Sequence, residues 1–187
     1  MSLLPLGLLS QGGGGGAAGA FEQIATAYGT GSSGVIDFTS IPSTYTHLQI
    51  RYTAKNTSAL ANMNITFNGV TSANYARHHV AGTGNAASAA NATSANNISL
   101  LNAVTASTIA NTATAGVIDI LDYANTNKNK TLRAIYGLVD TSSGTSFVYA
   151  ASGFLNSTTA ITSVTLTASA NNFATMSRFS LYGIKGS

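Results

Sequence analysis

The chain has 187 residues, a formal net charge of +3 and only 7% charged residues, and it contains no cysteine. Eight scattered Lys and Arg residues do not form the basic footprint of a nucleic-acid-binding protein, and the lack of cysteine excludes disulfides and thiolate metal sites. No apolar run is long enough to span a membrane. Hydrophobic residues make up 44% of the chain, which is enough for the core of one domain.

The first 20 residues predict an arm that precedes the folded domain. Leu3–Leu9 is apolar but is interrupted by Pro5 and Gly7, so a helix is not expected, and it lacks the basic segment of a signal peptide. Gly12–Gly16 forms a flexible tether. We expect the arm to bind another subunit through its leucines, namely Leu3, Leu4, Leu6, Leu8 and Leu9.

The energies of burial and ordering are similar in this arm. Fully burying one leucine contributes roughly 1.5–3 kcal/mol. Ordering the tether costs about 1–2 kcal/mol per residue. The arm is therefore expected to order only where a neighbour offers a groove. The alternative interpretation is a disordered tail.

Residues 21–187 read as one β domain. Phe21–Tyr28 alternates and opens it, and Gly29–Gly34 matches G-x-G-x-x-G but is followed by β-branched residues instead of a helix, so we expect a hairpin turn and no dinucleotide site. Thr46–Thr53 and Asn62–Asn68 alternate cleanly between apolar and polar residues. Both predict half-buried antiparallel strands.

The middle of the chain is less regular. Tyr75–Val80 is dense in histidine, but His78 and His79 are adjacent, so on a strand they point to opposite faces and cannot chelate one metal ion. Ala81–Ala115 is an uncharged stretch rich in Ala, Ser, Thr and Asn. It predicts a long excursion with a weak strand at Asn97–Leu101 and room for a helical turn in Ala86–Ala92.

The strongest hairpin pattern lies in Gly116–Val139, where two apolar runs flank the polar centre Asn125–Lys130. Further strands are expected at Phe147–Leu155, Ala160–Ala168 and Arg178–Ile184. Roughly ten strands without a convincing helix predict an antiparallel β-sandwich of the jelly-roll kind. The expected core includes Leu48, Ile50, Ile118, Ile120, Leu132, Tyr136, Leu166 and Leu181.

No stretch has the pattern of a catalytic, cofactor or metal site, so we expect a protein that is not an enzyme. A carbohydrate-active enzyme, which needs two convergent carboxylates, is the alternative from another class. Asp119 and Asp122 are three residues apart and would face opposite ways on a strand. The chain's acidic residues are Glu22, Asp37, Asp119, Asp122 and Asp140.

Three segments carry a resemblance to a known kind of module: Gly34–Asn56, Val117–Gly137 and Ala160–Gly186. Together with the opening LLPLGLLSQGGGGG they resemble a module found in virion proteins of tailed bacteriophages. The resemblance implies a structural protein located in the virion and assembled in the host cytoplasm. It brings no catalytic residue, and it implies a homotrimer, because related virion sandwiches commonly trimerise.

From this resemblance we expect a capsid decoration (cement) protein whose partners are other virion proteins, such as the major capsid protein or tail proteins. The single domain with an apolar arm fits a subunit that attaches to a lattice, and we expect attachment through the arm and a face of the sandwich. The alternative is a tail fibre or appendage subunit that binds the host surface, including a host glycan. We expect no cofactor, no nucleic acid and no membrane among its partners.

Overall fold

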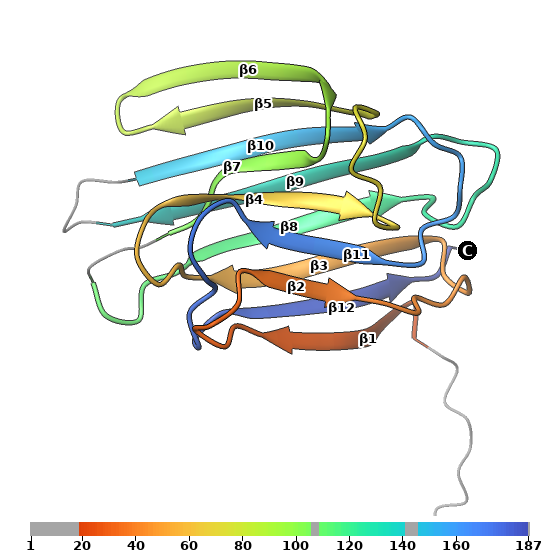
Figure 1. Ribbon diagram of the computed structural model, residues 1–187, viewed down its shortest axis with the longest axis horizontal. Helices are drawn as coiled ribbons and strands as arrows, with labels where there is room; N and C mark the ends of the chain where they lie inside the picture. The colour runs from red at the N-terminus through yellow and green to blue at the C-terminus, as the bar shows by residue number, and fades with distance from the viewer. Residues whose placement is uncertain (1–18, 106–108, 141–145, 187) are drawn as a thin grey trace, which may run out of the picture.

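A computed structural model describes residues 19–105, 109–140 and 146–186. These residues form two antiparallel sheets packed face to face, with no helix among them (Figure 1). In spatial order, the larger sheet consists of β1 (Phe21–Tyr28), β12 (Arg178–Ile184), β3 (His47–Ala54), β8 (Thr114–Leu121), β9 (Lys130–Val139), β10 (Ser146–Leu155), β5 (Tyr75–Thr83) and β6 (Ala86–Ala95). The smaller sheet consists of β2 (Val35–Phe38), β11 (Val164–Ala168), β4 (Ala61–Phe67) and β7 (Ile98–Val104).

The strand order is that of a jelly roll with two inserted hairpins. If β5–β6 and β9–β10 are set aside, the chain alternates between sheets except from β4 to β7, which are neighbours in the smaller sheet, and the remaining orders are β1-β12-β3-β8 and β2-β11-β4-β7. These are the two four-stranded sheets of an eight-stranded double Greek key. The inserted hairpins add four strands to one edge of the larger sheet only. The expected all-β jelly-roll sandwich is therefore confirmed.

The core lies between the sheets and follows the alternation in the sequence. Leu48, Ile50 and Tyr52 of β3 are buried, as are Met63, Ile65 and Phe67 of β4. All eight core residues expected from the sequence are buried: Leu48, Ile50, Ile118, Ile120, Leu132, Tyr136, Leu166 and Leu181. Because every second residue of these strands is polar, each strand has one apolar face, and the apolar faces of the two sheets pack together into one core.

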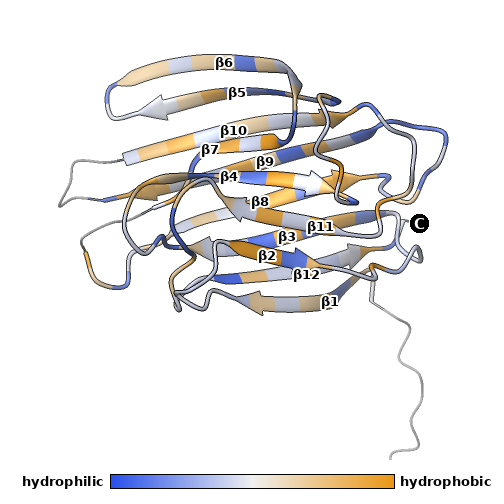
Figure 2. Ribbon diagram, in the orientation of Figure 1, coloured by the Kyte–Doolittle hydropathy of each residue, from blue (hydrophilic) through white to orange (hydrophobic). Residues whose placement is uncertain are grey.

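The Ala-rich stretch differs from expectation. No helical turn occurs in Ala86–Ala92, because β6 continues through it as a ten-residue edge strand paired along β5. Its side chains are mostly exposed, and Figure 2 shows it mostly in pale colours. A strand of small residues with no apolar alternation gives no periodic signal, and it is held by its backbone ladder to β5.

The G-x-G-x-x-G segment also differs from expectation. Gly29–Gly34 is not a hairpin turn, since it carries the chain from β1 in the larger sheet to β2 in the smaller one. The amides of Gly29 and Gly31 donate to the carbonyls of Ser177 and Phe173. A Cβ on Gly29 would lie 2.2 Å from the carbonyl oxygen of Ala174, so close backbone packing explains that glycine.

The predicted binding residues of the arm, Leu3, Leu4, Leu6, Leu8 and Leu9, lie outside the described residues.

Candidate interaction surface

The outer face of the larger sheet carries a continuous apolar surface that the strand register builds. Val117 pairs with Ile135, Ile135 with Ala150, Ala150 with Val80 and Val80 with Ala89. The parallel row two residues further on aligns small residues and one valine in the same way. We call these two rows the apolar band: Val117, Ile135, Ala150, Val80 and Ala89, with Ala115, Gly137, Val148, Gly82 and Ala87.

The band is exposed and hollowed. Ile135, Val148 and Val80 have exposed fractions of 65%, 57% and 51%, although β-branched side chains on a sheet usually face a core. Two open hollows lie along the band, with volumes of about 780 Å³ and 550 Å³, and both are lined by Ile135 and Val148. The glycines and alanines form the low floor between the larger side chains. The surface is therefore both hollowed and apolar, as protein contact sites are.

A polar row runs beside the band and limits it on one side. The Asp119 carboxylate accepts hydrogen bonds from Gln49 Nε2 (2.8 Å) and Arg133 Nε (2.9 Å), and Arg51 Nε donates to Gln49 Oε1 (2.8 Å). Ser152 pairs with both Arg133 and His78, which extends the row across β10 and β5. Asp119 thus serves to hold neighbouring side chains across three strands.

A cationic and aromatic group limits the band at its β3 end. The Arg51 guanidinium lies 4.9 Å from the ring centre of Phe21 and 5.7 Å from that of Tyr182, and these two rings stack at 4.6 Å. Arg51, Tyr182 and Arg178 line the larger hollow together with the apolar side chains. The surface therefore passes from apolar over β8–β6 to basic and aromatic over β12 and β3.

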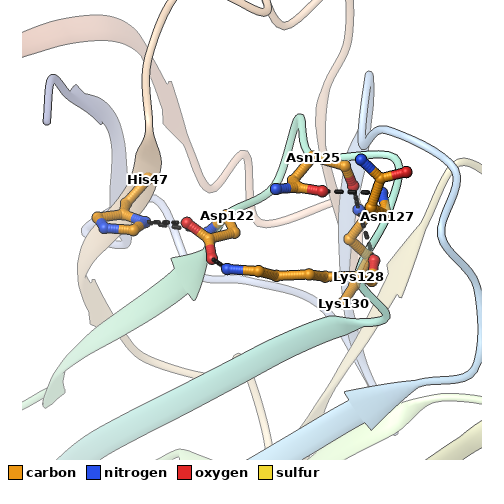
Figure 3. A network of polar contacts seen from close by, with 6 residues as sticks. All are labelled: His47, Asp122, Asn125, Asn127, Lys128 and Lys130. Carbon is orange, nitrogen blue, oxygen red and sulfur yellow. Dashed lines mark hydrogen bonds and ion pairs between the residues drawn. The ribbon is translucent and has the colours of Figure 1, made fainter.

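The turn between β8 and β9 contains a separate polar network (Figure 3). The Asp122 amide donates to Nδ1 of His47 (2.9 Å), and its carboxylate accepts from Lys128 Nζ (2.6 Å), which holds the pKa of Asp122 below its ordinary value. Since Nδ1 of His47 accepts this hydrogen bond, its 3.6 Å contact with the Asp122 carboxylate is not an ion pair in this arrangement. The buried Lys130 ammonium donates to the carbonyls of Asn125 and Lys128, and burial lowers its pKa. These groups satisfy one another and fix the turn.

The histidines of β5 are separated as the sequence predicted. His78 is exposed on the outer face, whereas His79 is buried and packs against Tyr149, with ring centres 5.5 Å apart. Burial lowers the pKa of His79, because it disfavours the imidazolium. Within the described residues, no group of three or more His, Cys, Asp or Glu side chains could hold a metal ion.

Four of the acidic side chains hold contacts within the fold. Asp119 and Asp122 hold the contacts given above, Asp37 accepts from Thr165 (2.6 Å), and Glu22 accepts from Lys185 (3.0 Å) and Tyr45 (3.0 Å). The hydrogen bonds from Lys185 and Tyr45 lower the pKa of Glu22. No acidic residue lines either hollow of the band.

Sequence reasoning placed attachment on the arm and on an unspecified face of the sandwich, and it did not identify the band. Each strand taken alone offers only two or three apolar residues on its outer face, and these look like ordinary surface variation. A signal was present in Val80, Ile135 and Val148, which occupy positions where the alternation calls for polar residues. The rows appear only when the register brings together strands that are far apart in the sequence.

Comparisons with protein-family models, curated proteins and solved structures gave no match. The part of the chain that the structure describes contains no helix long and apolar enough to cross a membrane.

Proposed function

We propose that the protein is a non-enzymatic structural protein of a tailed-bacteriophage virion. In this proposal it is a decoration (cement) protein of the capsid, attached through its N-terminal arm and the outer face of its larger sheet. The observation that carries the proposal is the exposed apolar band. A surface of this kind is used to contact other proteins, and it would be a liability on a subunit that remains alone.

Three further features support an assembly role. The low charge of the chain gives little repulsion between neighbouring copies. The rigid sandwich holds the band on regular strands instead of loops. The resemblance of Gly34–Asn56, Val117–Gly137 and Ala160–Gly186 to tailed-phage virion modules adds the location, the virion, and the expectation of a homotrimer.

A second candidate is a tail fibre or appendage subunit that binds the host surface. The observation that favours it is the group formed by Arg51, Phe21 and Tyr182, since Arg51 and Tyr182 line the larger hollow. Aromatic rings and a guanidinium are suited to stack on and hydrogen-bond to a sugar. In this alternative the hollow would hold a host glycan.

Copy number separates the two candidates. Quantitative mass spectrometry of purified particles measures the ratio of this chain to the major capsid protein. Hundreds of copies per particle are expected of a decoration protein, whereas a handful would indicate a fibre. Absence of the chain from purified particles would contradict both.

Attachment is tested with a truncated chain. Deleting Met1–Gln11 is expected to leave the sandwich folded, because β1 begins only at Phe21, and to abolish co-sedimentation with particles that lack the protein. Circular dichroism provides the folding control. Co-sedimentation at wild-type occupancy would show that the arm is not needed for attachment.

A further inference from the structure

The apolar band extends to one edge of the larger sheet, and the arm leaves from the opposite edge. Ala87 and Ala89 place the end of the band on the edge strand β6, whereas β1, at the other edge, follows the arm directly. Strand β6 is ten residues long, and it contains no charged residue and no proline. Apart from a bulge near its end, between Ala92 and Ala95, it therefore lacks the charges and prolines that usually protect an edge strand from another chain.

We propose that the leucine segment Met1–Gln11 of one copy of this chain binds to the apolar band of a second copy. The inference deepens the proposed function and rests on it, because it names the partner surface of the arm. The contact joins the β1 side of one subunit to the β6 side of the next. Because the two surfaces differ, the interface is head-to-tail, and copies joined in this way can close into a ring.

The chemistry of the two surfaces matches. Met1–Gln11 contains no charged side chain, and its leucines need apolar surroundings. The band also contains no charged side chain. The smaller hollow lies between Val80, Ile135 and Val148 and has no charged lining residue, whereas Arg51 and Arg178 line the larger hollow at its far end. Leucine side chains can enter the smaller hollow without removing water from a charged group.

The tether is long enough to reach the chain's own band, but the polar side chains on that path favour the band of a second copy. The segment of eight residues from Gly12 to Gly19 reaches at most about 26 Å when extended. Val117 of the same chain is three strand intervals and four residues away from Phe21, which is about 19 Å from the spacing of a sheet. This path crosses β12 and β3, where the tether would have to cover Gln49 and Arg51. If β1 of one copy lies beside β6 of a second copy, the band of that second copy begins at the edge next to the arm.

The cysteine-free sequence allows a direct test by disulfide trapping. One chain carries Leu6→Cys, a second chain of different mass carries Ile135→Cys, and the two are co-expressed, purified and oxidised. Ile135 is largely exposed, so its substitution leaves the core unchanged. The matched control places the second cysteine at Thr167, which lies on the outward side of β11 in the smaller sheet.

A disulfide-linked heterodimer with Ile135→Cys, at a yield at least tenfold above that of the Thr167→Cys control, is the expected result. Equal yields at the two positions would overturn the inference. So would a chain carrying both Leu6→Cys and Ile135→Cys that forms only the intramolecular disulfide.

The test uses the isolated protein, so its outcome is independent of the virion. Trapping without any copies in purified particles would refute the proposed function and leave the contact between copies in place. Copies in purified particles without trapping would refute the contact alone.

Discussion

Packing between the two sheets can be tested at Gly153 of β10, which faces Ile98 of β7. A Cβ at position 153 would lie 2.7 Å from both Cδ1 and Cγ2 of Ile98 and 2.9 Å from its Cγ1. Ile98 is fully buried, so it can move only by displacing other core residues. We predict that Gly153→Ala lowers the free energy of unfolding by about 1–3 kcal/mol, the usual cost of overpacking.

The structure also predicts that a second substitution compensates for this loss. Ile98→Ala alone should cost about 2–5 kcal/mol, because it leaves a cavity between the sheets. Independent effects would sum to about 3–8 kcal/mol. In the double variant, however, the methyl group of residue 153 occupies part of the space left by Ile98. The double variant should therefore lose less free energy of unfolding than the sum of the two single losses, by about 1 kcal/mol or more.

The assay is urea unfolding of the wild type, the two single variants and the double variant, followed by circular dichroism. The matched control is Gly82→Ala on the outer face, where a Cβ would meet only Val148 Cγ1 at 3.6 Å. This control should change stability by less than about 1 kcal/mol. A double-mutant cycle that is additive within about 0.5 kcal/mol would refute contact between β10 and β7 at this point.

Two further predictions concern the buried tyrosines. Tyr52→Phe should raise the thermal midpoint, because the Tyr52 hydroxyl is buried without a hydrogen-bond partner among the described residues. Tyr75→Phe should instead lower the free energy of unfolding by about 1–3 kcal/mol, and with it the thermal midpoint. The Tyr75 hydroxyl accepts a hydrogen bond from Phe67 N (2.9 Å) and donates one to Val70 O (3.1 Å). Equal shifts in the two variants would contradict this. Burial raises the pKa of Tyr136 above 10.0, so the unfolded chain ionises first and stability is lost as the pH rises above about 10, by up to about 1.4 kcal/mol per pH unit. Tyr136→Phe should make this alkaline decline shallower in urea titrations at several pH values, and an unchanged slope would refute the assignment.

The sequence predicted the elements whose two faces differ in polarity. In β3, Leu48 and Ile50 alternate with Gln49 and Arg51, so the strand and its buried face could be predicted together. The hairpin of β8 and β9 was also predicted, because two apolar runs flank a polar turn. In these segments the local pattern and the tertiary environment agree.

The strand β6 and the apolar band could not be predicted for physical reasons. Ala86–Ala95 is built from small residues that show no alternation, and it is a strand because β5 offers an unpaired edge. The band depends on register, which aligns Val80 of β5 with Val117 and Ile135 of the distant β8–β9 hairpin. The Gly29–Gly34 connection was misassigned because turn residues indicate a change of direction without indicating which sheet comes next.

The central claim, that the apolar band is an assembly surface, is tested most directly by the mass of the protein in solution. Light scattering at micromolar concentration should give a homotrimer for the wild type and a monomer for Ile135→Lys, because the substitution places a charge in the middle of the band. Thr167→Lys, on the outward side of the smaller sheet, should leave the wild-type mass unchanged. A wild-type protein that is already monomeric, or an Ile135→Lys variant that retains the wild-type mass, would contradict the claim.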